Sequence, residues 1–300
     1  MTIQQAVIKK LKLFSKRKSV NLLDGNYDSI FRGKGIELDS LRPYIFGDNV
    51  KDIDWRSTAR TGTVHTRLYS PLRDQKIIIV CDTTPSMLIK TQTQFNKLDI
   101  TYGLIVTLGL FVKKNQDLIS TCHIDSNGKL YISKFANTDK HIEKQLQKLD
   151  LAIHRTPPQL RLSLAELLKN SQYKFAQRSA IFIITDSIPN QEEIKPIIKK
   201  ISSKHQLFWL QIMPSSPFIK TDSYAKKLID IETNTTLNEY ISSSTVLHKE
   251  WIKQLNDSLL AQQNTCKSTG SAYGKVSDPI DLTKTLSKMF LDMRRYAKQQ

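Results

Sequence analysis

The sequence predicts an α/β protein with a Rossmann-like three-layer domain, whose sheet is mostly parallel with one antiparallel edge strand. Two continuous apolar, β-branched runs, 77–81 and 180–185, each end directly before an aspartate. A strand without alternation is buried on both faces, as in the centre of a parallel sheet. Helical patterns separate these runs, and Asn127-Gly128 is a strong hairpin signal that supplies the antiparallel strand.

The chain before the first buried strand divides into two parts. Residues 1–20 are expected to form a basic amphipathic helix, since Ile3, Val7, Leu11 and Phe14 recur at helical spacing. Its basic residues are Lys9, Lys10, Lys12, Lys16, Arg17 and Lys18. Residues 21–75 are rich in glycine and turns, with one alternating segment at 63–69, and are expected to form a subdomain of short strands.

The α/β domain is expected over residues 76–235. Its strands are predicted at 77–81, 118–124, 130–135, 180–185, 207–213 and 228–233, and its helices at 97–114, 138–150, 159–170 and 190–203. Residues 236–300 are expected to form a C-terminal helical extension, with helices near 238–262 and 281–298.

Composition narrows the functional classes. No apolar run approaches the roughly 20 residues that span a bilayer, and the N-terminus lacks the apolar core of a secretory signal. Three scattered cysteines without metal-ligand spacing indicate a reduced, cytoplasmic protein. The net charge of +17 favours an anionic partner such as an acidic protein, a nucleic acid or the inner membrane face. A lysine-rich composition without any such partner is the alternative.

Polar residues follow both aspartate-terminated strands. Asp82, Thr84 and Ser86 alternate after the first strand, and Asp186 follows the second. Ligands bind beyond the carboxyl ends of parallel strands, where the strand order reverses. If the two strands are neighbours, both carboxylates face one crevice, and their oxygens with the two hydroxyls suit Mg²⁺ or Mn²⁺. Strand-end capping and turn formation are the structural alternative for each residue alone.

Asp-x-Thr-x-Ser at a strand end resembles the metal-ion-dependent adhesion site of von Willebrand A domains, which has the pattern Asp-x-Ser-x-Ser. The pair Thr185-Asp186 matches the later aspartate of that family. Thr156 is the candidate for its additional threonine ligand, although its spacing from the following helix fits poorly. The resemblance implies a von Willebrand A-type fold with a bound divalent cation.

Residues 33–60 carry a second set of motifs, which resembles the signature of the bacterial domain of unknown function 58. Its members here are Gly33, Gly35, Glu37, Arg42, Tyr44, Gly47, Asp48, Ile53, Asp54, Trp55, Ala59 and Arg60, followed by Asp82, Thr84, Ser86 and Met87. We expect Trp55 to be buried, with paired charges holding the subdomain together, rather than to form an exposed cluster. The resemblance implies a functional link to AAA+ ATPases of the MoxR type and no defined catalytic activity.

The leading functional hypothesis is a metal-dependent adaptor rather than an enzyme, in which a partner's acidic residue completes the shell of a metal held by the site. The alternative is Mg-dependent phosphoryl transfer with Asp82 as nucleophile. Thr84 stands where haloacid-dehalogenase phosphatases carry a second aspartate, and it cannot act as a general acid near neutral pH. A third hypothesis is binding of an anionic surface, with residues 1–18 on a membrane, although packing of their apolar stripe on the protein's own domain is the favoured alternative for this helix. Binding of nucleic acid is disfavoured because no recognised motif is present.

Overall fold

The structure is a computed structural model, and it describes residues 37–70, 75–88, 96–157, 160, 162–187, 189–213, 228–229, 236–237 and 245–297. The helix expected over residues 1–20 lies outside these ranges, as do Gly33 and Gly35. Within the described residues, no helix combines the length and the apolar character that crossing a membrane requires.

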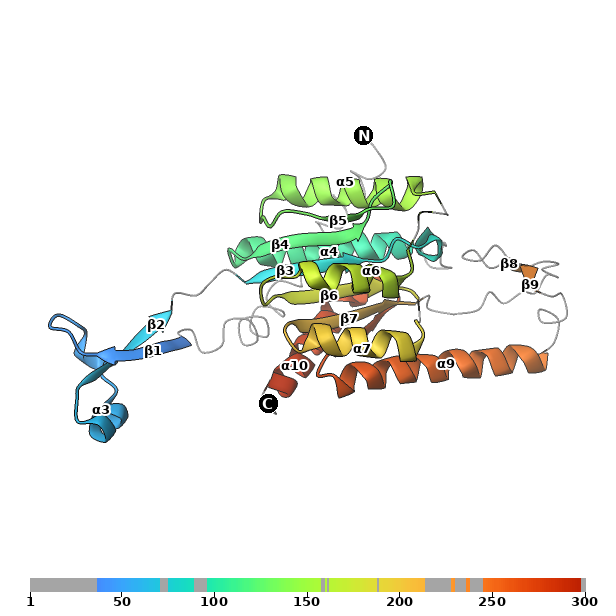
Figure 1. Cartoon of the computed structure of the whole chain (residues 1–300). Helices are drawn as coiled ribbons and strands as arrows, with labels where there is room; N and C mark the ends of the chain where they lie inside the picture. Colours follow the sequence, from blue (N-terminus) through green and yellow to red (C-terminus); the bar gives the residue numbers. More distant parts are fainter. Residues whose placement is uncertain are drawn as a thin grey trace.

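A six-stranded sheet forms the centre of the molecule (Figure 1). Its order is β10-β7-β6-β3-β4-β5, and every neighbouring pair is parallel except β4 with β5. The strands are β3 (Lys76–Cys81), β4 (Leu118–Ile124), β5 (Leu130–Ile132), β6 (Ala180–Thr185), β7 (Gln206–Ile212) and β10 (Ala272–Val276). The predicted mostly parallel sheet with one antiparallel edge strand is therefore confirmed.

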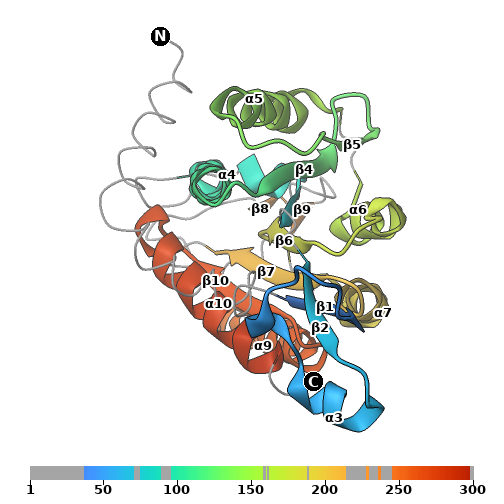
Figure 2. The ribbon, with the colours of Figure 1, turned by 90° about the vertical axis from the view of Figure 1, so that its left-hand side faces the viewer.

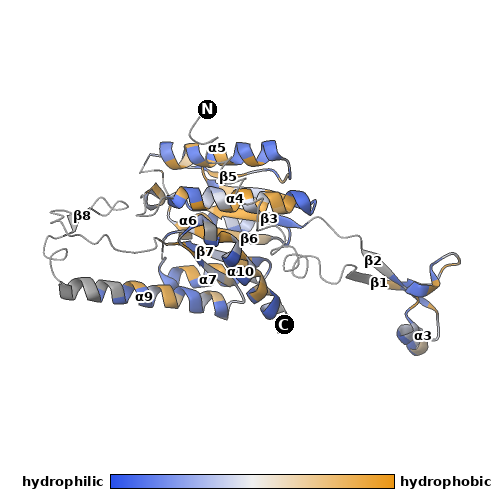
Figure 3. Cartoon of the chain, turned by 180° about the vertical axis from the view of Figure 1, so that it is seen from behind, coloured by the Kyte–Doolittle hydropathy of each residue, from blue (hydrophilic) through white to orange (hydrophobic). Residues whose placement is uncertain are grey.

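Helices cover both faces of the sheet, which gives the predicted three layers (Figure 2). One core cluster joins one face of the sheet to α4 (Lys97–Lys114), α5 (Asp139–Arg155) and α10 (Leu282–Ala297). The other joins the opposite face to α6 (Leu164–Ser171), α7 (Gln191–Ser202) and α9 (Thr245–Ser268). The central strands β3, β6 and β7 are mostly apolar, because they are buried on both faces of the sheet (Figure 3).

The sheet differs from the prediction at its end. The strand expected at 228–233 is β8 (Leu228–Ile229), which pairs with β9 (Thr236–Leu237) in a separate two-stranded sheet. The sixth strand of the main sheet is β10, which pairs in parallel with β7. The sheet domain therefore continues beyond residue 235, because β10 and α10 complete its sheet and its core.

The described part of the signature subdomain is an antiparallel pair, β1 (Glu37–Pro43) with β2 (His65–Ser70). The connection between them carries a short 3-10 helix, η1 (Val50–Asp52), and α3 (Trp55–Thr61). Since β2 is followed closely by the start of β3, this subdomain joins the sheet at the amino ends of its strands (Figure 1). The remaining 3-10 helices are η2 (Pro85–Leu88), η4 (Gln172–Lys174) and η5 (Pro279–Asp281).

Candidate metal site at the carboxyl edge of the sheet

The two aspartate-terminated strands are neighbours in the sheet. β3 and β6 pair in parallel in register, and the amide of Asp82 donates to the carbonyl of Ile184 at 3.0 Å. The chain then turns into η2, which carries Ser86 back towards β6. The Ser86 hydroxyl donates to Oδ1 of Asp186 at 2.8 Å. The structure thus joins the ends of these two strands by direct polar contacts, as the sequence pattern predicts.

Asp82 is the buried end of the site, with 1% of its surface exposed. Its Oδ1 accepts a hydrogen bond from the amide of Thr84 at 2.9 Å, and its Oδ2 accepts one from the hydroxyl of Thr185 at 2.6 Å. Burial, followed by the nearby charge of Asp186, raises the pKa of Asp82 to about 6, while the bonds from Thr185 and Thr84 act in the opposite direction. The site therefore holds negative charge at a real energetic cost.

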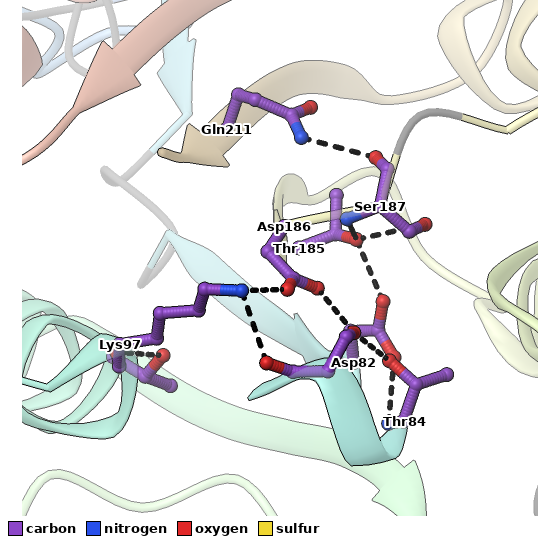
Figure 4. A network of polar contacts seen from close by, with 9 residues as sticks. Asp82, Thr84, Lys97, Thr185, Asp186, Ser187 and Gln211 are labelled. Atoms are coloured by element: carbon purple, nitrogen blue, oxygen red, sulfur yellow. Dashed lines mark hydrogen bonds and ion pairs between the residues drawn. The ribbon is translucent and has the colours of Figure 1, made fainter. Parts of the chain in front are cut away.

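The four predicted ligands lie in one hydrogen-bonded group (Figure 4). The hydroxyls of Thr84 and Ser86 are 3.0 Å apart, which links the Asp82 end to the Asp186 end. The side-chain atoms of these four residues that could bind a metal are all oxygens, which Mg²⁺ and Mn²⁺ prefer as ligands. In the described residues no three His, Cys, Asp or Glu side chains form a cluster, so the site depends on hydroxyls as well as carboxylates. With that composition, these residues fit a divalent cation.

Three further side chains, which were not predicted as site residues, contact the proposed ligands or the turn that carries them. Thr185, which holds Asp82, is itself bonded by the amide of Ser187 at 2.9 Å. The Gln211 amide group donates to the carbonyl of Ser187 at 3.0 Å, which fixes the turn after β6. The ammonium of Lys97 forms an ion pair with Oδ2 of Asp186. The only signal in the sequence for Thr185 was its place beside Asp186, and no local pattern indicated the role of Lys97.

Thr156, the candidate fifth ligand, ends α5. It is buried, and its hydroxyl donates to the carbonyl of Ala152 and, at 3.2 Å, to that of Asp125. These bonds satisfy backbone acceptors at the end of the helix, a capping role for a threonine. A metal-ligating role for Thr156 stays a prediction.

The first half of the signature builds a turn. Gly47 has a φ of +104°, a conformation that L side chains rarely adopt, so a glycine is required there. Arg42 pairs with Asp48 at 2.6 Å, and the Ile45 amide donates to the same carboxylate at 3.1 Å. Those contacts, led by the Ile45 bond, lower the pKa of Asp48. Tyr44 is held through its backbone, whose amide donates to Val64 at 2.8 Å.

The second half of the signature starts α3. Asp54 accepts from the amide of Ser57 at 3.0 Å as the N-cap and pairs with Arg67 at 3.0 Å. The expected burial of Trp55 is wrong, because 65% of its surface is exposed at the first turn of α3. Arg60 is also exposed. The charged pairs hold the subdomain together as expected. The tryptophan side chain is exposed because, among the described residues, no further element packs over this short helix.

Comparison with known proteins places both regions in one family. The family model described as "Protein of unknown function DUF58" matches residues 40–238. Uncharacterized proteins of Mycobacterium bovis and Mycobacterium tuberculosis are each 22% identical over 208 residues, 69% of this chain and 64% of theirs. The chain thus spans slightly less than two thirds of the length of these relatives.

Solved structures similar to this chain include proteins with von Willebrand A domains. The conserved hypothetical protein BatB of Bacteroides thetaiotaomicron is 17% identical with a TM-score of 0.46, over 74% of this chain and 99% of that one. A von Willebrand factor type A protein of Catenulispora acidiphila is 9% identical with a TM-score of 0.38, over 76% of this chain and 44% of that one.

Proposed function

This chain belongs to the family described as protein of unknown function DUF58, and we propose that it acts as a metal-dependent protein-binding adaptor of the von Willebrand A type rather than as an enzyme. The observation that carries the proposal is the hydrogen-bonded group of two carboxylates and two hydroxyls at the carboxyl edge of β3 and β6. Oxygen side chains from two neighbouring strand ends match the preference of a hard divalent cation.

The proposed ligands form two sides of the site, one that is buried and fixed and one that lies nearer to solvent. Asp82 is buried and fixed on both oxygens, by the Thr84 amide and the Thr185 hydroxyl, so it is the anchored side. Ser86 is partly exposed and forms the side that a partner reaches, whereas only 5% of the Asp186 side chain is exposed. Asp82, Thr84, Ser86 and Asp186 would hold Mg²⁺ or Mn²⁺, which would supply an electrophilic centre for a carboxylate oxygen of a partner protein.

For the partner we propose an AAA+ ATPase of the MoxR type that offers an acidic residue to the site. The family resemblance supports this choice, as does the net charge of +17, which favours an acidic surface. We place the encounter in the cytoplasm, in keeping with three cysteines that are all buried and unpaired.

A binding role explains the site better than phosphoryl transfer does. In a phosphatase, Asp82 would attack a phosphorus atom directly, yet only 1% of its surface is exposed and both oxygens already accept hydrogen bonds. Thr84, which takes the place of a general acid, is also buried and bonded to Ser86. Ser86 is the partly exposed member of the group, and its end of the site suits contact with a partner's side chain.

Calorimetric titration of Mg²⁺ and Mn²⁺ into the full chain tests the metal site. Asp82→Ala should abolish binding. Asp139→Ala, which removes an exposed acid paired with Lys113 on another part of the domain, should bind like the wild type. Circular dichroism of each variant confirms the fold. If the wild type binds neither ion at millimolar concentration, and removal of the Lys97 ammonium does not restore binding, the metal-dependent adaptor is ruled out.

A second titration tests the partner. A MoxR-type ATPase is titrated with the chain in Mg²⁺ and again in EDTA. We expect binding that EDTA and Asp82→Ala both abolish and that Asp139→Ala preserves. Binding that is equal in Mg²⁺ and EDTA would show that the contact bypasses the metal, and a complete lack of binding would remove this partner.

A further inference from the structure

A lysine ammonium already lies within the candidate metal site. Lys97 is the first residue of α4 and only 7% of its surface is exposed. Its Nζ is paired with Oδ2 of Asp186 and donates to the carbonyl of Ser86 at 3.0 Å (Figure 4). One cation therefore contacts two residues that we propose as metal ligands.

The position of Lys97 is unfavourable except for these contacts. A cation at the first turn of a helix opposes the helix dipole, which favours negative charge there. Burial of an ammonium also removes its hydration, so the group needs a charged partner and further acceptors. Asp186 and the Ser86 carbonyl supply both, which explains why the side chain turns back over the end of β6 instead of extending into solvent.

The charges of the group show what the lysine does there. Asp82 and Asp186 bring two carboxylates, and Lys97 brings one ammonium to the more exposed of them. A divalent cation that uses Asp186 meets this ammonium as a like charge at close range. Lys97 and a bound divalent cation would therefore compete for the Asp186 carboxylate.

We propose that Lys97 is an internal competitor of the metal, which occupies Asp186 in the metal-free protein and must release it before a divalent cation binds fully. This inference rests on the proposed function and adds its regulation. The competition keeps metal affinity low in the free protein. A partner that draws the Lys97 ammonium to its own acidic surface would raise that affinity, so metal and partner would bind cooperatively.

A purely structural role for Lys97 makes the opposite prediction. If the ion pair only held Asp186 in position, its loss would disorder the ligand and weaken metal binding. If Lys97 competes, its loss frees an oriented carboxylate and strengthens binding. The direction of the change in metal affinity therefore separates the two roles.

The test is Mn²⁺ binding to Lys97→Met, measured by electron paramagnetic resonance and calorimetry, with melting curves in EDTA and in Mg²⁺. Lys113→Met is the matched control, since it removes an exposed lysine at the other end of the same helix. We expect Lys97→Met to bind at least about tenfold more tightly than the wild type, from the repulsion of like charges at close range. It should melt lower in EDTA and gain more than the wild type from Mg²⁺, while Lys113→Met binds like the wild type.

Each other outcome has a definite meaning. Unchanged or weaker binding by a folded Lys97→Met overturns the competition while leaving the metal site in place. Absence of binding in both the wild type and Lys97→Met removes the proposed function and the competition with it. Binding by Lys97→Met alone supports competition in its strongest form. If Lys97→Met does not fold, Lys97→Gln keeps a hydrogen-bond donor to Asp186 without the charge and must show the same tighter binding.

Discussion

Asp82→Asn is expected to make the metal-free protein more stable at neutral pH, although it removes a predicted ligand. Burial and the charge of Asp186 raise the pKa of Asp82 from 3.8 to about 6. Between these values the native state binds more protons than the unfolded chain, so the stability of the wild type falls as the pH rises through this window. A shift of this size corresponds to ~3 kcal/mol at pH 7, which the asparagine variant does not lose.

The assay is urea denaturation of the wild type and Asp82→Asn in EDTA at several pH values from 4 to 8. The difference between the two free energies of unfolding cancels the titration of every other group. Asparagine loses one acceptor for Thr185, which costs ~1 kcal/mol at all pH values, so the change of the difference with pH is the decisive quantity. It should rise by ~2.4 kcal/mol in favour of the variant between pH 4 and pH 7.

A difference that stays constant over this pH range would refute the reasoning, because it would show that Asp82 is ionised in the native state without penalty. Asp139→Asn controls for the loss of a carboxylate in an exposed place and should give no such rise. In saturating Mg²⁺ the advantage should shrink or reverse, since the metal stabilises only the protein that binds it.

Three further variants test other parts of the structure. Thr185→Val removes the hydroxyl that donates to Asp82 and should cost ~1.5–3 kcal/mol in urea denaturation at pH 7, as expected for a bond to a charged group. Gly274→Ala places a Cβ against the sulfur of Met289 and 2.7 Å from the Thr285 methyl of α10 and should cost ~1–3 kcal/mol by overpacking, seen as a lower melting temperature. Asp54→Ala removes the cap that accepts from Ser57 and should cost ~1 kcal/mol locally, seen as faster hydrogen exchange in α3 with unchanged metal affinity.

Each of these variants has a result that would contradict its reasoning. Thr185→Ser keeps the hydroxyl, and if it were as unstable as Thr185→Val, the lost bond would not be the cause. Gly274→Ala at wild-type stability would show that α10 moves away without cost. Weaker metal binding by Asp54→Ala would show that the signature subdomain and the metal site are coupled.

The strands that carry the site could be predicted because a strand buried on both faces is a continuous apolar run, which is easily recognised in the sequence. The runs at β3 and β6 are wholly apolar and end at Asp82 and Asp186, and the chemistry at these ends is local in sequence. α4 begins and ends where predicted, since its apolar length between flanking charges is unambiguous. The pairing of β3 with β6 was the condition on which the predicted crevice depended, and the structure meets it.

The features that could not be predicted depend on contacts between distant residues. β10 contains Gly274, which reads as a turn residue, but the glycine is there because α10 packs directly against the strand. Lys97 reads as a solvated charge at a helix start, and its partner Asp186 is 89 residues away. Trp55 was expected to be buried from its residue type alone, and the thinness of the subdomain around α3 decides otherwise.

The place where the signature subdomain enters the sheet has a thermodynamic consequence. It is attached at the amino end of β3, and Asp82 follows the carboxyl end of the same strand, about 20 Å away for a strand of this length. Substitutions this far apart with no shared partner add to within ~0.3–0.5 kcal/mol. The effects of Trp55→Ala and Asp82→Ala on stability should therefore sum in the double variant. The signature subdomain and the candidate metal site can therefore be varied one at a time, and the energetic effect of a change at either end of β3 can be measured without correction for the other.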